Sequence, residues 1–142
     1  MSEIGSQQQR FAAQSVKPTI YVVDDDDAVL GSLRFLLEAD GLNVRTFRSG
    51  TALLNAVRSA TVDCFVIDYK MPDINGIELT GRLRKSNIQA PVILISGYPG
   101  ENISTRAAAA GIKEVILKPL LEENLTKRIR SAIQDEHPQR AQ

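Results

Sequence analysis

Four consecutive aspartates, Asp24 to Asp27, directly follow the apolar run 20–23. Neighbouring carboxylates repel one another, so a fold that gathers several at one point usually does so to hold a cation. A second apolar run, 64–67, also ends in an acid, Asp68. An apolar run that ends in acids indicates a buried strand whose carboxyl end opens into a site. Two neighbouring strands of this kind would form a small metal pocket.

Strand-like and helix-like segments alternate after Pro18. Four of the strand candidates are nearly continuous apolar runs, which is typical of strands covered on both faces. The candidate at 43–47 alternates between polar and apolar residues, so we expect it at a sheet edge. In chain order the candidates are Thr19–Val23, Asn43–Phe47, Cys64–Asp68, Pro91–Ser96 and Glu114–Leu117.

Apolar residues at helical spacing lie between and after these strands. Glycines at 41 and 111 follow two of the predicted helices as expected C-terminal caps. Five such units with short connections predict an α/β fold, a doubly wound five-stranded parallel sheet with helices on both faces. The predicted helices centre on residues 29–37, 53–57, 77–84, 103–110 and 121–133.

The carboxyl ends of the predicted strands carry Asp24, Asp25, Asp68 and Ser96. In open parallel sheets the binding site lies beyond these ends, at the point where the strand order reverses. Asp24 and Asp25 are the expected site residues of the acidic run because they follow the strand immediately. Asp26 and Asp27 are expected to start the next helix, where carboxylates satisfy free amide groups and favour the helix dipole.

Four pieces of the sequence together resemble the receiver domain of two-component response regulators, over roughly residues 18–134. They stand in order at the ends of the first, third, fourth and fifth predicted strands, which makes the combination specific. The resemblance implies a (βα)5 flavodoxin-like receiver fold. The pieces are Val23-Asp24-Asp25, Ile67-Asp68-Tyr69-Lys70-Met71-Pro72-Asp73-Ile74-Asn75-Gly76, Leu94-Ile95-Ser96-Gly97 and Leu117-Lys118-Pro119.

The resemblance implies that Asp68 accepts a phosphoryl group from a sensor histidine kinase or a histidine phosphotransfer protein. Transfer to a carboxylate depends mainly on positioning and charge neutralisation. Mg²⁺ (or Mn²⁺) would be held by Asp24, Asp25 and Asp68, together with the backbone carbonyl of Lys70. Such a chain is a phosphoacceptor and not an enzyme beyond slow self-catalysed phosphotransfer and dephosphorylation. Its output would be altered contacts with other proteins.

Two further site residues follow from the same resemblance. Lys118 would place its ammonium group against Asp68 and then against the phosphoryl oxygens. Ser96 would donate its hydroxyl to one of those oxygens. Receivers usually carry Phe or Tyr three residues before this lysine, but here the position is Val115, whose short, stiff side chain cannot swing inward. Tyr98, two residues past Ser96, is a candidate substitute for this switch.

Two other functions remain open, whereas the sequence argues against a phosphatase, a flavin-binding protein and an EF-hand. Val115 supports a receiver-like binding module with weak or no phosphorylation-driven switching, and the chain could also be the receiver part of a longer transcriptional regulator. A haloacid dehalogenase-like phosphatase requires an acid where Lys70 stands. A flavin phosphate would be repelled by the acidic loop. An EF-hand requires alternate acidic spacing and a glycine.

Composition limits the remaining classes. Equal numbers of acidic and basic residues, 17 each, give no indication of a nucleic-acid binder. No apolar run approaches the roughly 20 residues that cross a bilayer, and the single cysteine cannot form an internal disulfide, so cytoplasmic location is the default expectation. We expect a mobile N-terminal arm (1–17), a receiver domain (18–134) and a polar tail (135–142) that leaves no room for a DNA-binding domain.

Overall fold

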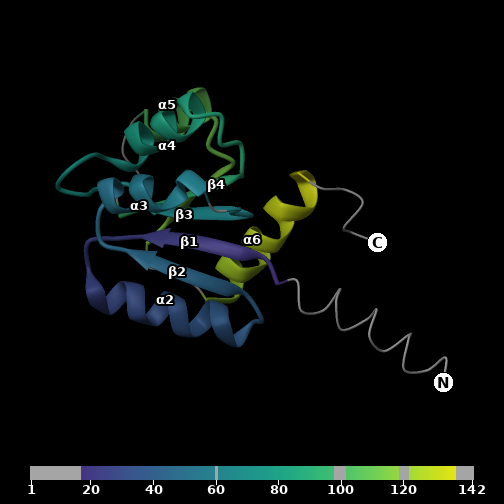
Figure 1. The fold of residues 1–142 in the computed structure, drawn as a ribbon. Helices are drawn as coiled ribbons and strands as arrows, with labels where there is room; N and C mark the ends of the chain where they lie inside the picture. The colour runs from purple at the N-terminus through teal and green to yellow at the C-terminus, as the bar shows by residue number, and fades with distance from the viewer. Residues whose placement is uncertain (1–16, 60, 98–101, 119–121, 137–142) are drawn as a thin grey trace, which may run out of the picture.

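Five parallel strands form the central sheet (Figure 1). The computed structural model describes residues 17–59, 61–97, 102–118 and 122–136. The strands lie in the order β2-β1-β3-β4-β5, so the strand order reverses at β1, between β2 and β3. The doubly wound parallel sheet predicted from the sequence is therefore confirmed. The strands are β1 (Thr19–Val23), β2 (Asn43–Phe47), β3 (Cys64–Asp68), β4 (Val92–Ser96) and β5 (Glu114–Leu117).

Helices cover both faces of this sheet. α2 and α6 lie on one face, and α3, α4 and α5 lie on the other (Figure 1). A short 3-10 turn, η1, extends α3. The helical elements are α2 (Asp27–Ala39), α3 (Gly50–Ala56), η1 (Val57–Ser59), α4 (Gly76–Lys85), α5 (Ile103–Ala109) and α6 (Glu122–Glu136).

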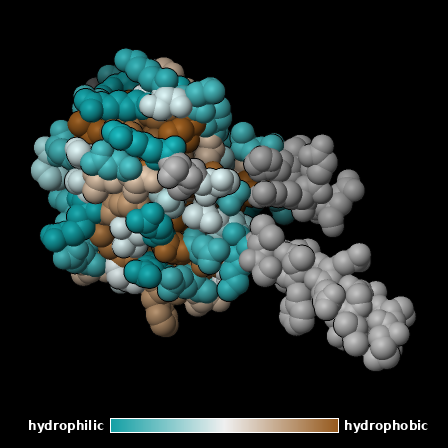
Figure 2. Space-filling view, viewed as in Figure 1, coloured by the Kyte–Doolittle hydropathy of each residue, from teal (hydrophilic) through white to brown (hydrophobic). Residues whose placement is uncertain are grey.

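Alternate residues of each inner strand enter two separate apolar clusters. On β1, Ile20 and Val22 pack beneath α2 and α6, whereas Tyr21 and Val23 pack beneath the other three helices. This two-sided burial explains why the inner strands read as continuous apolar runs. β2 does lie at an edge, and its residues 43 and 45 are exposed, as its alternating sequence predicted. Hydrophilic side chains dominate the face seen in Figure 2, with narrow apolar bands between them.

Helix ends follow the local sequence closely. The carboxylate of Asp26 accepts hydrogen bonds from the amides of Ala28 and Val29, so it caps α2 as predicted. Gly41 and Gly111, which follow α2 and α5, adopt φ values of +87° and +85°. This left-handed conformation is costly for other residues and explains the glycines.

The start of α4 is built against the end of β3. Asn75 and Glu78 form a capping box, in which each side chain bonds to the other residue's backbone amide. A Cβ on Gly76 would lie 2.8 Å from the main-chain oxygen of Asp68 and 2.5 Å from Cδ1 of Leu94. Glycine is therefore required at position 76 for α4 to approach the strand this closely.

The C-terminal boundary differs from the expectation. α6 continues through Asp135 and Glu136, which the sequence interpretation placed in the polar tail. Lys113 Nζ lies 3.0 Å from Asp135 Oδ2, and this ion pair ties the last turn to the residue before β5. Residues 1–16 of the predicted arm and Leu121 of the predicted last helix lie outside the described residues. Within the described ranges, no helix is long and apolar enough to cross a membrane.

Candidate metal and phosphoacceptor site

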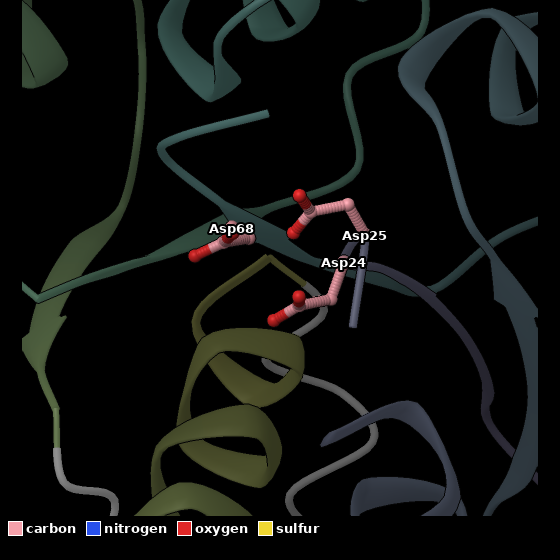
Figure 3. A group of neighbouring side chains, drawn as sticks. All are labelled: Asp24, Asp25 and Asp68. Atoms are coloured by element: carbon pink, nitrogen blue, oxygen red, sulfur yellow. The ribbon is translucent and has the colours of Figure 1, made fainter. Parts of the chain in front are cut away.

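Three carboxylates meet at the carboxyl edge of the sheet. Asp24 and Asp25 follow β1, and Asp68 ends β3, the strand beside it. One oxygen from each carboxylate lies within 4.8 Å of the others, and Figure 3 shows the three side chains gathered at this edge. Asp24 and Asp68 are buried, whereas Asp25 is exposed. The structure thus brings together the three acids that the sequence singled out.

Lys118, which directly follows β5, supplies a positive charge at this cluster. Its Nζ lies 3.2 Å from Oδ1 of Asp68 and 3.7 Å from Oδ2 of Asp24. Its backbone amide donates to the carbonyl of Ser96, which keeps the end of β5 beside the end of β4. The lysine therefore reaches the acids from two strands away.

Burial disfavours the charged forms of the two buried acids, Asp24 and Asp68. It raises the pKa of Asp24 to about 6, even though the amide of Asp26 and the ammonium of Lys118 act in the opposite direction. Burial also raises the pKa of Asp68, and Lys118 offsets this effect only in part. Burial alone would lower the pKa of Lys118, but the two acids outweigh it and raise the value.

The donor set fits a hard divalent cation. The side chains gathered here offer carboxylate oxygens, which Mg²⁺ and Mn²⁺ favour, and this group of three acids lies beside the ammonium group of Lys118. The surrounding open pocket has a volume of about 660 Å³. It is lined by Asp24, Asp25, Asp26, Asp68, Lys70, Met71, Pro72, Gly97 and Lys118.

The remaining predicted site residues have mixed outcomes. Lys70 lines the pocket, whereas the assignment of its backbone carbonyl to the metal stays a prediction. Ser96 is buried at the end of β4, one residue before the pocket-lining Gly97. Val115 is half-buried on β5 and packs in the apolar cluster beneath α3, α4 and α5. Tyr98 lies outside the described residues, so its switching role stays a prediction.

An anchor in the loop between β3 and α4 was missed by the sequence interpretation. The carboxylate of Asp73 accepts hydrogen bonds from the amide and hydroxyl of Thr51, at 2.9 and 3.0 Å. Burial would raise the pKa of Asp73, but the donors of Thr51 and neighbouring amides lower it to about 2. This contact holds the loop carrying Lys70 against the start of α3. No spacing rule connects residues 51 and 73.

Known proteins share this sequence pattern and this fold. The family model described as the response regulator receiver domain matches residues 20–130. The response regulator protein TmoT of Ectopseudomonas mendocina is 39% identical over 114 residues, which cover 80% of this chain and 52% of that protein. The transcriptional regulatory protein FixJ of Bradyrhizobium diazoefficiens is 34% identical over 124 residues, covering 87% and 60%. The chain thus spans about half the length of the curated relatives it matches.

A solved structure of a receiver domain has the same fold as this chain. The CheY-like response regulator receiver domain protein of Methanospirillum hungatei superposes with a TM-score of 0.82 at 26% identity, covering 87% of this chain and 98% of that one. The chain belongs to the response regulator receiver domain family, a family of phosphoacceptor signalling domains in two-component systems. The family resemblance stated from the sequence is therefore confirmed.

Proposed function

We propose that this chain is a phosphorylation-driven signalling switch in which Asp68 is the phosphoacceptor. One observation carries the proposal: the carboxylate that ends β3 lies in an open pocket, with Lys118 Nζ 3.2 Å away and two further carboxylates beside it. The donor would be a phosphohistidine of a sensor kinase or phosphotransfer protein. This partner class follows from membership of the family.

The transfer step needs a free carboxylate oxygen and a way to neutralise charge. An oxygen of Asp68 forms a bond to phosphorus while the bond from phosphorus to the donor's imidazole nitrogen breaks, and that nitrogen keeps the electron pair. Lys118 pairs first with the carboxylate and then with the phosphoryl oxygens. Gly97 carries no side chain at the pocket wall, which leaves room for the donor.

Mg²⁺ fits the residues present. Asp24, Asp25 and Asp68 would hold it through carboxylate oxygens, and the carbonyl of Lys70 would add a further oxygen. Bound Mg²⁺ would supply positive charge that offsets the repulsion between these acids and an incoming phosphoryl group. Asp24 and Asp68, being buried, fix the geometry, and exposed Asp25 closes the cluster toward solvent.

The signal would leave through the chain that follows β4. Phosphorylation adds about −1.5 to −2 charges and three acceptor oxygens to the aspartate. These oxygens would attract the hydroxyl of Ser96, which ends β4 ahead of α5. A shift of α5 would then change the surface that other proteins contact. Val115 carries no aromatic ring at this point, so we expect a smaller switching amplitude.

Beryllofluoride, which imitates a phosphoryl group on aspartate, tests this proposal. In a ¹⁹F NMR titration we expect a bound signal that needs both the wild-type Asp68 and Mg²⁺. Asp68→Asn should abolish the signal, whereas the control Asp27→Asn should retain it, because Asp27 pairs with Arg48 and does not line the pocket. The absence of a bound signal in the wild type would contradict the proposal and favour a binding module without phosphorylation.

A role in transcription is a second candidate, supported by the printed name of FixJ. That output belongs to a longer protein, so for this chain it is a proposal only. Transcript profiles of cells carrying the Asp68→Asn variant at the native locus would test it. We expect a defined set of transcripts to change, and unchanged transcripts would leave protein contact as the output.

A further inference from the structure

We infer that the contact between Tyr69 and Arg106 carries the chemical state of Asp68 to helix α5. This inference rests on the proposed function, because it concerns how a change at the acceptor is transmitted. Nη1 of Arg106 donates a hydrogen bond to the hydroxyl of Tyr69 over 3.2 Å. The guanidinium carbon lies 6.0 Å from the centroid of the tyrosine ring. α5 is thereby tied to the residue that directly follows the acceptor.

The main chain of Tyr69 is fixed on both sides. Its amide donates to the carbonyl of Ile95 on β4, and its carbonyl accepts from the amide of Gly76 at the start of α4, both at 2.8 Å. A displacement at the end of β3 therefore moves the tyrosine ring along with the acceptor. A loop with a free main chain would absorb such a displacement instead.

The ring of Tyr69 lies on the side of the sheet that α5 covers. It is half-buried and packs against the apolar cluster that contains Ile103 and Ala107 of α5 and Val115 of β5. The side chain at 115 is too short and stiff to span from β5 to the acceptor. Tyr69 places an aromatic ring in this cluster directly beside the acceptor, and its hydroxyl reaches beyond the cluster to Arg106.

α5 is connected to the acceptor region by a second route. β4 ends at Ser96, and α5 begins at Ile103. A phosphoryl group that attracts the Ser96 hydroxyl pulls on the chain leading into α5, while Tyr69 stays with the acceptor strand. The Tyr69–Arg106 contact then either changes its geometry or holds α5 to the acceptor strand as the helix is displaced. The position of α5 and the loading of Asp68 are then coupled through this contact.

Amide chemical shifts of α5 measured with and without beryllofluoride and Mg²⁺ test the coupling. We compare the wild type with Tyr69→Phe, which keeps the ring but removes the hydroxyl, and with Arg106→Gln. The load-induced shifts in α5 should fall about twofold or more in both variants, a typical effect along a coupling network. Beryllofluoride binding, followed by ¹⁹F NMR, should still saturate. The double variant should show no further loss, because both changes remove the same contact.

Two more variants separate coupling from a general effect on the helix. Thr105→Ala changes the exposed neighbour of Arg106 and should keep the full response. Arg106→Lys retains a charged hydrogen-bond donor and should therefore recover part of the chemical-shift response of α5. An equal loss in Thr105→Ala, or full-sized shifts in Tyr69→Phe and Arg106→Gln with the site loaded, would overturn the inference and leave the proposed function standing. A wild-type protein that binds no beryllofluoride would contradict both the inference and the proposed function.

Discussion

At the scale of single residues, the run of four aspartates divides into distinct roles. Asp24 is buried against Lys118, and Asp25 faces the pocket. Asp26 caps α2 while also lining the pocket, and Asp27 pairs with Arg48 over 3.1 Å. Identical side chains in one run thus provide matched variants for testing which of them bind metal.

Asp25→Ala should weaken Mg²⁺ binding by at least about tenfold, which corresponds to about 1.4 kcal/mol. The reason is the loss of one of three carboxylate ligands from a site whose other two acids remain. Asp27→Ala removes the same chemical group outside the pocket and should leave the affinity unchanged. Isothermal titration calorimetry measures the Mg²⁺ affinity of both variants. Equal affinities would show that Asp25 is not a metal ligand.

Asp24 should make the stability of the metal-free protein depend on pH. Its folded pKa of about 6 lies above the ordinary value of 3.8, so the folded protein binds more protons between these values. The contribution of Asp24 to the free energy of unfolding therefore falls as pH rises from about 4 to about 6. Asn cannot ionise, so Asp24→Asn should remove this pH-dependent destabilisation. At neutral pH the free energy of unfolding should rise by up to about 3 kcal/mol relative to the wild type.

Urea denaturation of both proteins at several pH values, without divalent metal, measures this effect. The difference between Asp24→Asn and the wild type should grow as the pH rises through that window. Saturating Mg²⁺ should reduce the difference, because a bound cation favours the charged carboxylate. A difference that stays constant with pH would show that Asp24 titrates normally in the folded protein.

At the scale of elements, the close approach of α4 to β3 sets the position of Asp68. Gly76→Ala would place a Cβ against the main-chain oxygen of Asp68, and backbone atoms cannot yield as a flexible side chain can. We expect the free energy of unfolding to fall by about 1–3 kcal/mol. Denaturation by urea is again the measurement.

The same helix contains a matched control. A Cβ on Gly81 would meet no atom within 4 Å, and alanine favours the helix. Gly81→Ala should therefore raise the free energy of unfolding by roughly 0.5–1 kcal/mol. Stabilisation of both variants by similar amounts would mean that α4 can move away from Asp68 without cost.

The helix and strand pattern was predictable because each element follows local rules. Inner strands are apolar on both faces, so β1, β3 and β4 could be located from their runs alone. Helix starts could be found from Asn75 and the acids at 26 and 27. The end of α6 could not, because the polar residues after Ile133 carry no apolar spacing that continues the helix, and the contact of Asp135 with Lys113 joins residues far apart in sequence.

At the scale of the whole molecule, sheet topology explains why the site could be predicted and its readout could not. Parallel strands deliver their carboxyl ends to one edge, so the acids after β1 and β3 had to meet there. Contacts such as Asp73 with Thr51, or Tyr69 with Arg106, depend on how loops and helices pack. Sequence periodicity carries no information about such pairs.

Metal binding should stabilise the whole fold, because the proposed ligands lie at the ends of two strands that separate on unfolding. At a Mg²⁺ concentration 100 times the dissociation constant, the free energy of unfolding should rise by about 2.7 kcal/mol. Asp25→Ala at the same metal concentration should gain much less. A thermal midpoint that is identical with Mg²⁺ and with chelator would show that the folded protein does not bind the ion at this edge.

The most direct measurement of the central claim is mass spectrometry of the protein after incubation with acetyl phosphate and Mg²⁺. We expect a mass gain of one phosphoryl group, located on the peptide that contains Asp68, and we expect no gain when metal is chelated. The Asp68→Asn protein should show no such gain. A wild-type protein that remains unmodified, or an Asp68→Asn protein modified to the same extent, would contradict the assignment of Asp68 as the acceptor.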